Sequence, residues 1–171
     1  MHRIYRTTTN HENVLNLLRR AQDLEEEYRD WFTSLPPSWQ TKSEAWFEDD
    51  GTIDYATSVF HPGRIDSYSE MWIAYHTNVA RSSRIVIWSI TLRCVAWLAH
   101  PRDYRLTLEY ARAQQVCRPL IEDIVASCPF FFSWNKDKNA AMADKSFFAC
   151  GTQDTESVKC LWGIFVMWPL L

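Results

Sequence analysis

The chain has 171 residues, a net charge of −3 and an isoelectric point near 5.9, a balance that argues against a dedicated nucleic-acid surface. Its hydrophobic fraction of 47% and aromatic fraction of 15% exclude a largely disordered chain. Only four Gly and seven Pro occur, which argues against a β-rich fold with many turns.

The N-terminal part of the chain has the pattern of an amphipathic helix, which we expect over residues 10–33. Asn10 is a suitable N-cap, and apolar residues recur at helical spacing from Val14 to Phe32. The following segment, 36–65, mixes aromatic and acidic residues without a helical period. We expect this segment to be a long aromatic connector that lies over the core rather than an element of its own.

A second helix is expected over residues 66–99, beginning near Asp66 or Ser67 and ending before Pro101. Beyond residue 84 it is apolar on nearly every side, which is typical of a helix buried at the centre of a helical domain. We therefore expect its stretch from about 68 to 98 to be the central element of the fold.

This apolar stretch also has to be weighed as a membrane span. The segment from Ile85 to Ala99 is shorter than the roughly 20 residues that a bilayer requires, and Arg93 interrupts it. We interpret it as a core helix and expect no membrane association. We also expect part of its surface, or of the tail from Leu161, to be uncovered in the monomer.

The C-terminal half predicts two further helices. The first covers 103–128 and contains Pro119, where we expect a kink or a restart because proline removes a backbone hydrogen bond. A loop over 129–153 and a last helix over 154–171 follow. The predicted fold is therefore all-α, an irregular multi-helix array around the central helix. We expect residues 1–171 to form a single domain, or a fragment of a larger helical domain.

Sequence patterns of catalysis and metal binding are absent from this chain. It has no nucleophile elbow, P-loop or His-Glu-x-x-His motif, and its five Cys form no Cys-x-x-Cys pair. We therefore expect no enzyme activity, no cofactor and no metal site, with reduced cysteines in the nucleus or cytoplasm.

Three groups of residues allow both a structural and a functional interpretation. Arg81 and Arg84 lie at i, i+3 on one helix. They could bind a carboxylate or phosphate ligand. We favour the interpretation that they pair with the acidic connector or remain exposed. The acidic and aromatic segment from Ser43 to Tyr55 is typical of coactivator-binding segments, although we favour an ordered cover over the core. Four tryptophans either pack in the core or line a ligand pocket, namely Trp72, Trp88, Trp97 and Trp162.

Four short motifs follow one another along the chain. They are Leu-Pro-Pro-Ser-Trp at 35–39, a helix opened by Tyr68, Asp-Ile-Val-Ala-Ser-Cys-Pro at 123–129, and Phe-Val-Met-Trp-Pro-Leu at 165–170. In this order they resemble the regulatory, or middle homology, region of fungal binuclear zinc-cluster transcription regulators. The matching positions are Tyr68, Asn78, Arg81, Arg84, Ile124, Pro129, Trp168 and Pro169. The family has Trp and Tyr where this chain has Thr77 and Ala80.

The resemblance implies a non-enzymatic regulatory domain in the nucleus that acts through a protein partner or a second copy of itself. The six clustered cysteines of the family's DNA-binding part are missing, so we expect no direct nucleic-acid binding. Two alternatives remain: a small-molecule-sensing helical domain with the tryptophan pocket, or a non-functional truncated gene product.

Overall fold

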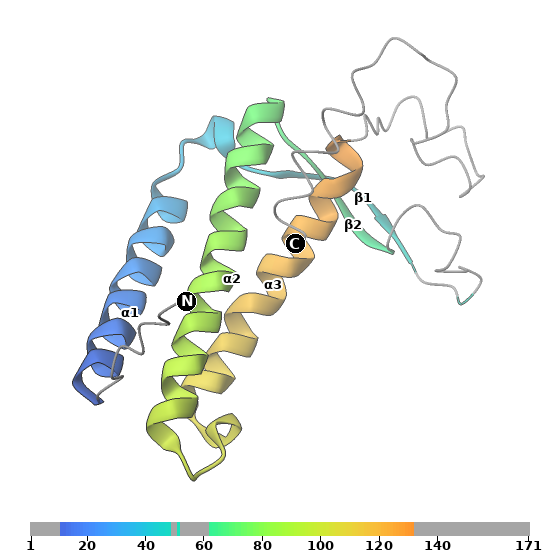
Figure 1. Ribbon diagram of the computed structural model, residues 1–171. Helices are drawn as coiled ribbons and strands as arrows, with labels where there is room; N and C mark the ends of the chain where they lie inside the picture. The colour runs from blue at the N-terminus through green and yellow to red at the C-terminus, as the bar shows by residue number, and fades with distance from the viewer. Residues whose placement is uncertain (1–10, 49–50, 52–61, 132–171) are drawn as a thin grey trace, which may run out of the picture. The chain divides into compact units, whose positions relative to one another are not determined.

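The computed structural model describes residues 11–48, 51 and 62–131, and 76% of these residues are helical (Figure 1). Three long helices, α1 (His11–Ser34), α2 (Met71–Ala99) and α3 (Leu108–Phe131), account for most of them. The predominantly α-helical class is confirmed. The predicted loop over 129–153, beyond residue 131, and the predicted helix over 154–171 lie outside the described residues.

The described residues divide into two compact units. The first unit contains residues 11–34 and 83–119, and the second contains 35–48, 51, 62–82 and 120–131. Helices α2 and α3 each contribute one part to each unit. The single domain expected over 1–171 includes residues outside the described ranges and stays a prediction.

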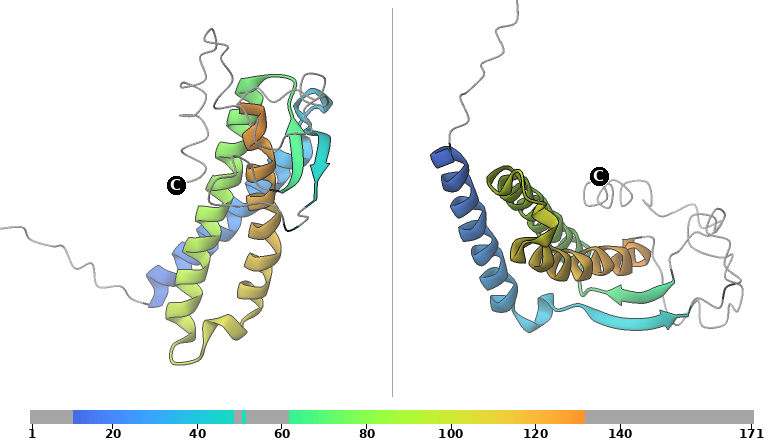
Figure 2. Two further views of the ribbon diagram at one scale, coloured as in Figure 1. Left: turned by 90° about the vertical axis from the view of Figure 1, so that its right-hand side faces the viewer. Right: turned by 90° about the horizontal axis from the view of Figure 1, so that it is seen from below.

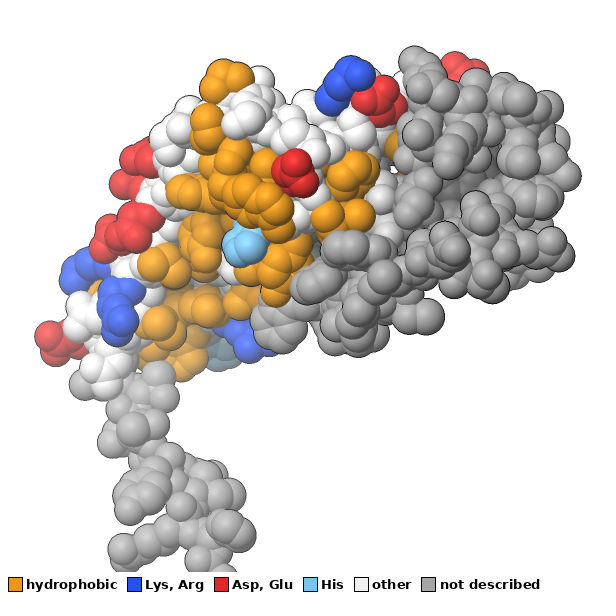
Figure 3. Space-filling view, turned by 90° about the horizontal axis from the view of Figure 1, so that it is seen from above, with side chains coloured by type: hydrophobic (Ala, Val, Ile, Leu, Met, Phe, Trp, Pro, Cys, Tyr) orange, Lys and Arg blue, Asp and Glu red, His pale blue; other side chains and the backbone are white. Residues whose placement is uncertain are grey.

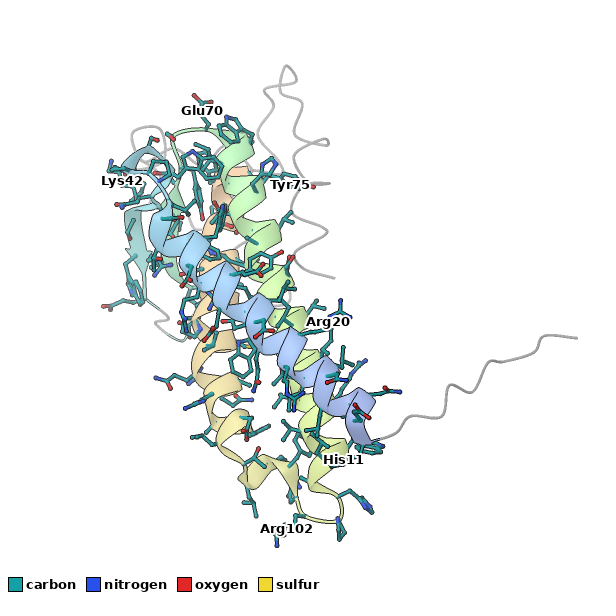
Figure 4. All side chains as sticks on the ribbon, turned by 90° about the vertical axis from the view of Figure 1, so that its left-hand side faces the viewer. His11, Arg20, Lys42, Glu70, Tyr75 and Arg102 are labelled. Atoms are coloured by element: carbon teal, nitrogen blue, oxygen red, sulfur yellow. The ribbon has the colours of Figure 1, made fainter. Side chains whose placement is uncertain are left out.

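In the first unit, α1 packs antiparallel to the part of α2 after residue 82 (Figure 1). The ring centroid of His11, at the start of α1, lies 6.1 Å from that of Trp97, near the end of α2. Glu25, further along α1, forms an ion pair with Arg84, which lies nearer the start of α2. Only Val14 and Ala21 of α1 are buried. The exposed Arg20 of α1 and Arg102 of the α2–α3 turn are labelled in Figure 4.

In the second unit, two strands lie in the segment that the sequence predicts to be an aromatic connector rather than an element of its own. A 3-10 helix, η1 (Pro37–Trp39), precedes β1 (Lys42–Phe47), which pairs antiparallel with β2 (Gly63–Ser67), as Figure 2 also shows. The register shifts between Ser43 and Ala45. The expectation that segment 36–65 contains no element of its own is therefore wrong for its described residues. The sequence does not reveal the strand clearly, because such a register shift breaks the two-residue alternation by which a strand is recognised.

Helix α2 begins at Met71, four to five residues later than predicted. Asp66 and Ser67 have the side chains of helix N-caps, but both belong to β2. Asp66 accepts two hydrogen bonds from the Arg64 guanidinium instead of capping a helix. The ion pair of Asp66 with Arg64 on the same strand, together with the ion pair of Arg64 with Asp123 on α3, therefore outweighs the capping preference, which is worth about 1 kcal/mol.

Helix α3 begins at Leu108, five residues later than predicted, and runs without interruption through both of its prolines to Phe131. Of the kink or restart expected at Pro119, the restart does not occur, and the predicted end at residue 128 is wrong. An interior proline costs a helix about 3 kcal/mol. Burying a Phe side chain offsets most of this cost, at about 1.5–3 kcal/mol, and Phe131 at the end of α3 is 0% exposed. Tertiary packing of the last turn explains why α3 continues past Pro129.

The core of the second unit is a small apolar cluster of Tyr68, Ile73, Ala74 and Phe131. Partly buried side chains surround it, including Trp39, Met71 and Cys128. Desolvation raises the pKa of the partly buried Cys128 thiol to about 11, so the thiol is unreactive at neutral pH.

The expectation that α2 is a central buried helix is only half correct. Trp72, Val86 and Trp97 are 51%, 57% and 45% exposed. The uncovered surface expected near residues 85–98 is therefore confirmed, and the tail from Leu161 lies outside the described residues. By length and composition α2 could cross a membrane, although Arg81, Arg84 and Arg93 lie within it. One such helix is weak support for a membrane location.

Candidate functional site

Seven polar side chains of the second unit form one connected network, which joins β2, α2 and α3. We call these residues the polar network: Arg64, Asp66, Tyr68, Asn78, Arg81, Asp123 and Ser127. Each element contributes for a local reason. Arg64 and Asp66 share a face of β2 because side chains alternate along a strand, and Asn78 and Arg81 share a face of α2 at i, i+3 spacing.

One half of the polar network consists of the Arg64 guanidinium and the two carboxylates that it binds. Its Nε and Nη2 atoms donate to the two Asp66 carboxylate oxygens at 2.8 and 2.9 Å, a bidentate arrangement. Nη2 also donates to Oδ1 of Asp123 on α3. The Asp66 side chain is 1% exposed, whereas the Arg64 side chain is 38% exposed, so only the carboxylate of this pair is removed from water. Two carboxylates of different elements therefore share a single guanidinium.

The other half of the polar network is built on Arg81, which is 5% exposed. Its Nη1 donates to the Tyr68 hydroxyl at 2.6 Å and to Asn78 Oδ1 at 2.9 Å, and its Nη2 lies 3.3 Å from Asp123 Oδ2. Asn78 Nδ2 then donates to Ser127 Oγ at 2.7 Å. Asp123 thus connects the two arginines, and the chain of contacts is continuous.

The charges of the polar network balance, with two guanidinium groups and two carboxylates. A buried ion network of this kind adds little net stability compared with apolar residues, but removing one member leaves an uncompensated buried charge. Arg81 is therefore occupied internally and does not present a free site for a carboxylate or phosphate ligand. Its partner Asp123 belongs to α3, not to the acidic connector that the sequence suggests.

Burial raises the pKa of the Asp66 carboxyl above its ordinary value of 3.8, because desolvation of the carboxylate outweighs the opposing hydrogen bonds from Arg64. The pKa of Arg64 is raised by the same hydrogen bonds, so the guanidinium stays charged. Between the ordinary and the raised pKa, the folded chain binds more protons at this position than the unfolded chain. The contribution of Asp66 to stability therefore falls as pH rises through that window.

This linkage predicts a pH-dependent difference between the wild type and Asp66→Asn. We expect the unfolding free energy of the wild type, relative to the variant, to be highest below about pH 4 and to fall as pH rises through the raised pKa. Urea unfolding of both proteins at a series of pH values measures this difference. A difference that grows with pH would show that the pKa of Asp66 is lowered in the folded state.

Arg84 has an internal partner in the first unit. Its Nε lies 3.1 and 3.2 Å from the two carboxylate oxygens of Glu25 on α1, and both side chains are largely buried, at 13% and 14% exposed. The guanidinium also lies over the Phe32 ring, 5.4 Å from its centroid, within the range of a cation–π contact. Arg84 is therefore neither exposed nor paired with the acidic connector, the two interpretations that the sequence favoured, but is paired with Glu25 of α1.

A double-mutant cycle on Arg84→Ala and Glu25→Ala is expected to give a coupling energy of about 1–3 kcal/mol, because the pair is bidentate and mostly desolvated. The exposed pair of Arg29 and Glu26 on α1, 3.7 Å apart, is the matched control and should couple by about 0.5 kcal/mol or less. Denaturant unfolding measures both cycles. Equal coupling in the two cycles would contradict the importance of burial at Arg84.

The proposed tryptophan pocket is not assembled in the described residues. Trp72, Trp88 and Trp97 all lie on α2, and at about 1.5 Å of rise per residue the first and last are roughly 37 Å apart. Trp162 lies outside the described residues. Trp88 Nε1 and Thr77 Oγ1 are buried and have no hydrogen-bond partner among the described residues. Thr77 occupies the position of a large aromatic residue in the family motif.

The described motif positions fall into three groups. Tyr68, Asn78 and Arg81 belong to the polar network, Arg84 pairs with Glu25 in the first unit, and Ile124 and Pro129 are buried apolar residues of α3. Trp168 and Pro169 lie outside the described residues. Sequence reasoning missed Arg64 and Asp66, for which the only signal is two opposite charges spaced two residues apart.

The other candidate sites in the described part of the chain offer few side chains for catalysis or metal binding. No group of three or more His, Cys, Asp or Glu residues there could hold a metal ion. A depression of about 770 Å³ lies at the turn from α2 to η2 (Tyr104–Leu106) and is lined by residues 98–103, 106 and 107. Its Asp103 already pairs with Arg105.

Comparison with family models, with curated proteins and with solved structures finds no match to this chain.

Proposed function

We propose that this chain is a non-enzymatic regulatory domain that acts through protein interaction and resembles the middle region of the zinc-cluster regulators. The observation that supports this proposal is that polar motif residues are bonded internally, whereas several large apolar side chains are exposed. Three of the positions on which the resemblance rests, Tyr68, Asn78 and Arg81, make internal hydrogen bonds in the polar network. Large apolar residues are exposed instead, namely Leu17, Leu24, Trp46, Trp72, Val86, Trp97, Leu106, Leu108 and Ile121.

A contiguous exposed apolar patch is typical of a protein-interaction site, whereas single exposed apolar residues are common on any folded surface. In the second unit the exposed Trp72 lies against Trp39, with ring centroids 4.9 Å apart, and so belongs to a contiguous aromatic group. The acidic and aromatic segment of the sequence contributes a further exposed apolar residue. Trp46 lies in β1 and is 68% exposed, so within the described residues this segment is not a closed cover over the core. An outward tryptophan next to acidic residues supports the coactivator-type interpretation, and a nuclear location remains part of the proposal.

The test is to fuse the full chain to an unrelated DNA-binding domain and to measure a reporter gene in cells. We expect reporter expression to change severalfold, and this change to be lost in Arg81→Ala and kept in Arg93→Ala. The unfused chain should show no sequence-selective duplex binding at physiological salt. An unchanged reporter with a folded fusion protein, or selective duplex binding by the chain alone, would overturn the proposal.

A further inference from the structure

Four aromatic rings form a continuous cluster where η1 meets the start of α2, within the second unit. We call Trp39, Trp72, Tyr75 and His76 the aromatic corner. The rings of Trp39 and Trp72 are 4.9 Å apart and nearly perpendicular, at 85°. The Trp72 and His76 rings are 5.9 Å apart, and those of His76 and Tyr75 are 5.2 Å apart.

The aromatic corner is held in position by contacts beneath it. Ser69 Oγ donates to the Ser38 carbonyl at 2.7 Å and ties the start of α2 to η1. Trp39 packs against the apolar cluster of the second unit, and its backbone N–H donates to the Pro36 carbonyl at 2.9 Å. Trp72, by contrast, is 51% exposed. A fixed indole and an accessible indole therefore meet at a right angle.

One charged side chain, the exposed Glu70, lies in the two segments that form the aromatic corner, residues 35–41 and 68–80. The basic residue that follows the first segment, Lys42, is paired with Glu44 at 2.9 Å. His76 Nδ1 lies 2.7 Å from the Trp72 carbonyl oxygen and donates to it. Figure 4 labels Glu70 and Tyr75 at this end of α2, and Figure 3 shows an acidic side chain and a histidine among hydrophobic side chains on the same face.

We infer that the aromatic corner, with Glu70, binds a basic segment of a partner protein through an arginine or lysine side chain. Indole faces attract cations, and a guanidinium stacks on them with its flat surface. The Glu70 carboxylate supplies the opposite charge, whereas a purely apolar partner would leave it without a counter-charge. This inference rests on the proposed function, because it specifies the chemistry of the interaction partner.

The test uses the full chain labelled with ¹⁵N and follows its indole N–H signals by NMR. The probe is the peptide acetyl-Gly-Arg-Gly-Arg-Gly-amide, and its counterpart has citrulline, a neutral isostere, in place of arginine. We expect the arginine peptide to shift a subset of the indole signals saturably. An exposed cation–π contact predicts about two- to fivefold weaker binding of the citrulline peptide.

Variants locate the binding site. Trp72→Ala should abolish the saturable shifts, and Glu70→Gln, an exposed substitution that preserves the fold, should weaken binding about two- to fivefold. Trp46→Ala is the matched control, because Trp46 is even more exposed but lies on β1, and it should leave the affinity unchanged. Equal binding of the two peptides, an equal effect of Trp46→Ala, or no saturable shift would overturn the inference. In each of these cases, a reporter response of the tethered chain would still support the proposed function.

Discussion

Arg81→Ala is expected to lower the unfolding free energy of the chain by about 3–5 kcal/mol. The guanidinium is 5% exposed, and its removal takes donors away from the Tyr68 hydroxyl, Asn78 Oδ1 and the Asp123 carboxylate. Asp123 is then left next to Arg64 alone. Urea unfolding followed by far-ultraviolet circular dichroism measures the change.

Arg93→Ala is the matched control for this variant. Arg93 lies on the same helix but is exposed, so its replacement should change the unfolding free energy by about 0.5 kcal/mol or less. Arg81→Lys should fall between the two, because lysine keeps the charge but not the planar fork of donors. A loss below about 1 kcal/mol for Arg81→Ala would show that the polar network contributes little to the stability of the second unit.

Phe131→Ala is expected to be similarly destabilising, by about 3–5 kcal/mol, because it opens a cavity in a tightly packed site. Phe131 is 0% exposed and belongs to the apolar cluster with Tyr68, Ile73 and Ala74. The loss should also shorten α3, since packing of this ring offsets the helix-breaking effect of Pro129. Thermal and urea unfolding report the first effect, and amide hydrogen exchange of the last turn reports the second.

Ile121→Ala serves as the control on the same helix, because Ile121 is 50% exposed and should cost about 1 kcal/mol or less. Increased exchange confined to the last turn in Phe131→Ala would support the link between its burial and the helix end. If both variants destabilise the chain equally, the apolar cluster is not the core of the second unit.

The predicted helices succeed where one apolar face repeats over many turns. Helix α1 is observed at His11–Ser34, one residue from the expected 10–33 at each end. The predicted end of α2 before Pro101 also agrees with the observed end at Ala99. Periodicity of this kind is a local property, so no knowledge of the neighbouring elements is needed to read it.

The errors arise where a distant contact decides the local structure. The strands β1 and β2 are short, and the bulge in β1 hides its alternation. The polar pair Arg64 and Asp66 has the appearance of a turn or cap because its partner, Asp123, is 59 residues away from Arg64 in the sequence. A capping preference of about 1 kcal/mol cannot compete with such a buried charge arrangement.

The sequence by itself determined the helical class, the approximate extents of the three described helices and the motif positions on which the resemblance rests. Only the tertiary structure decided what those residues do. It pairs Arg84 with Glu25, again 59 residues away, joins Arg81 to Asp123, and separates the tryptophans of α2 along the helix. The physical reason is that helical periodicity follows from neighbouring residues, whereas the partner of a buried charge is set by how distant segments pack.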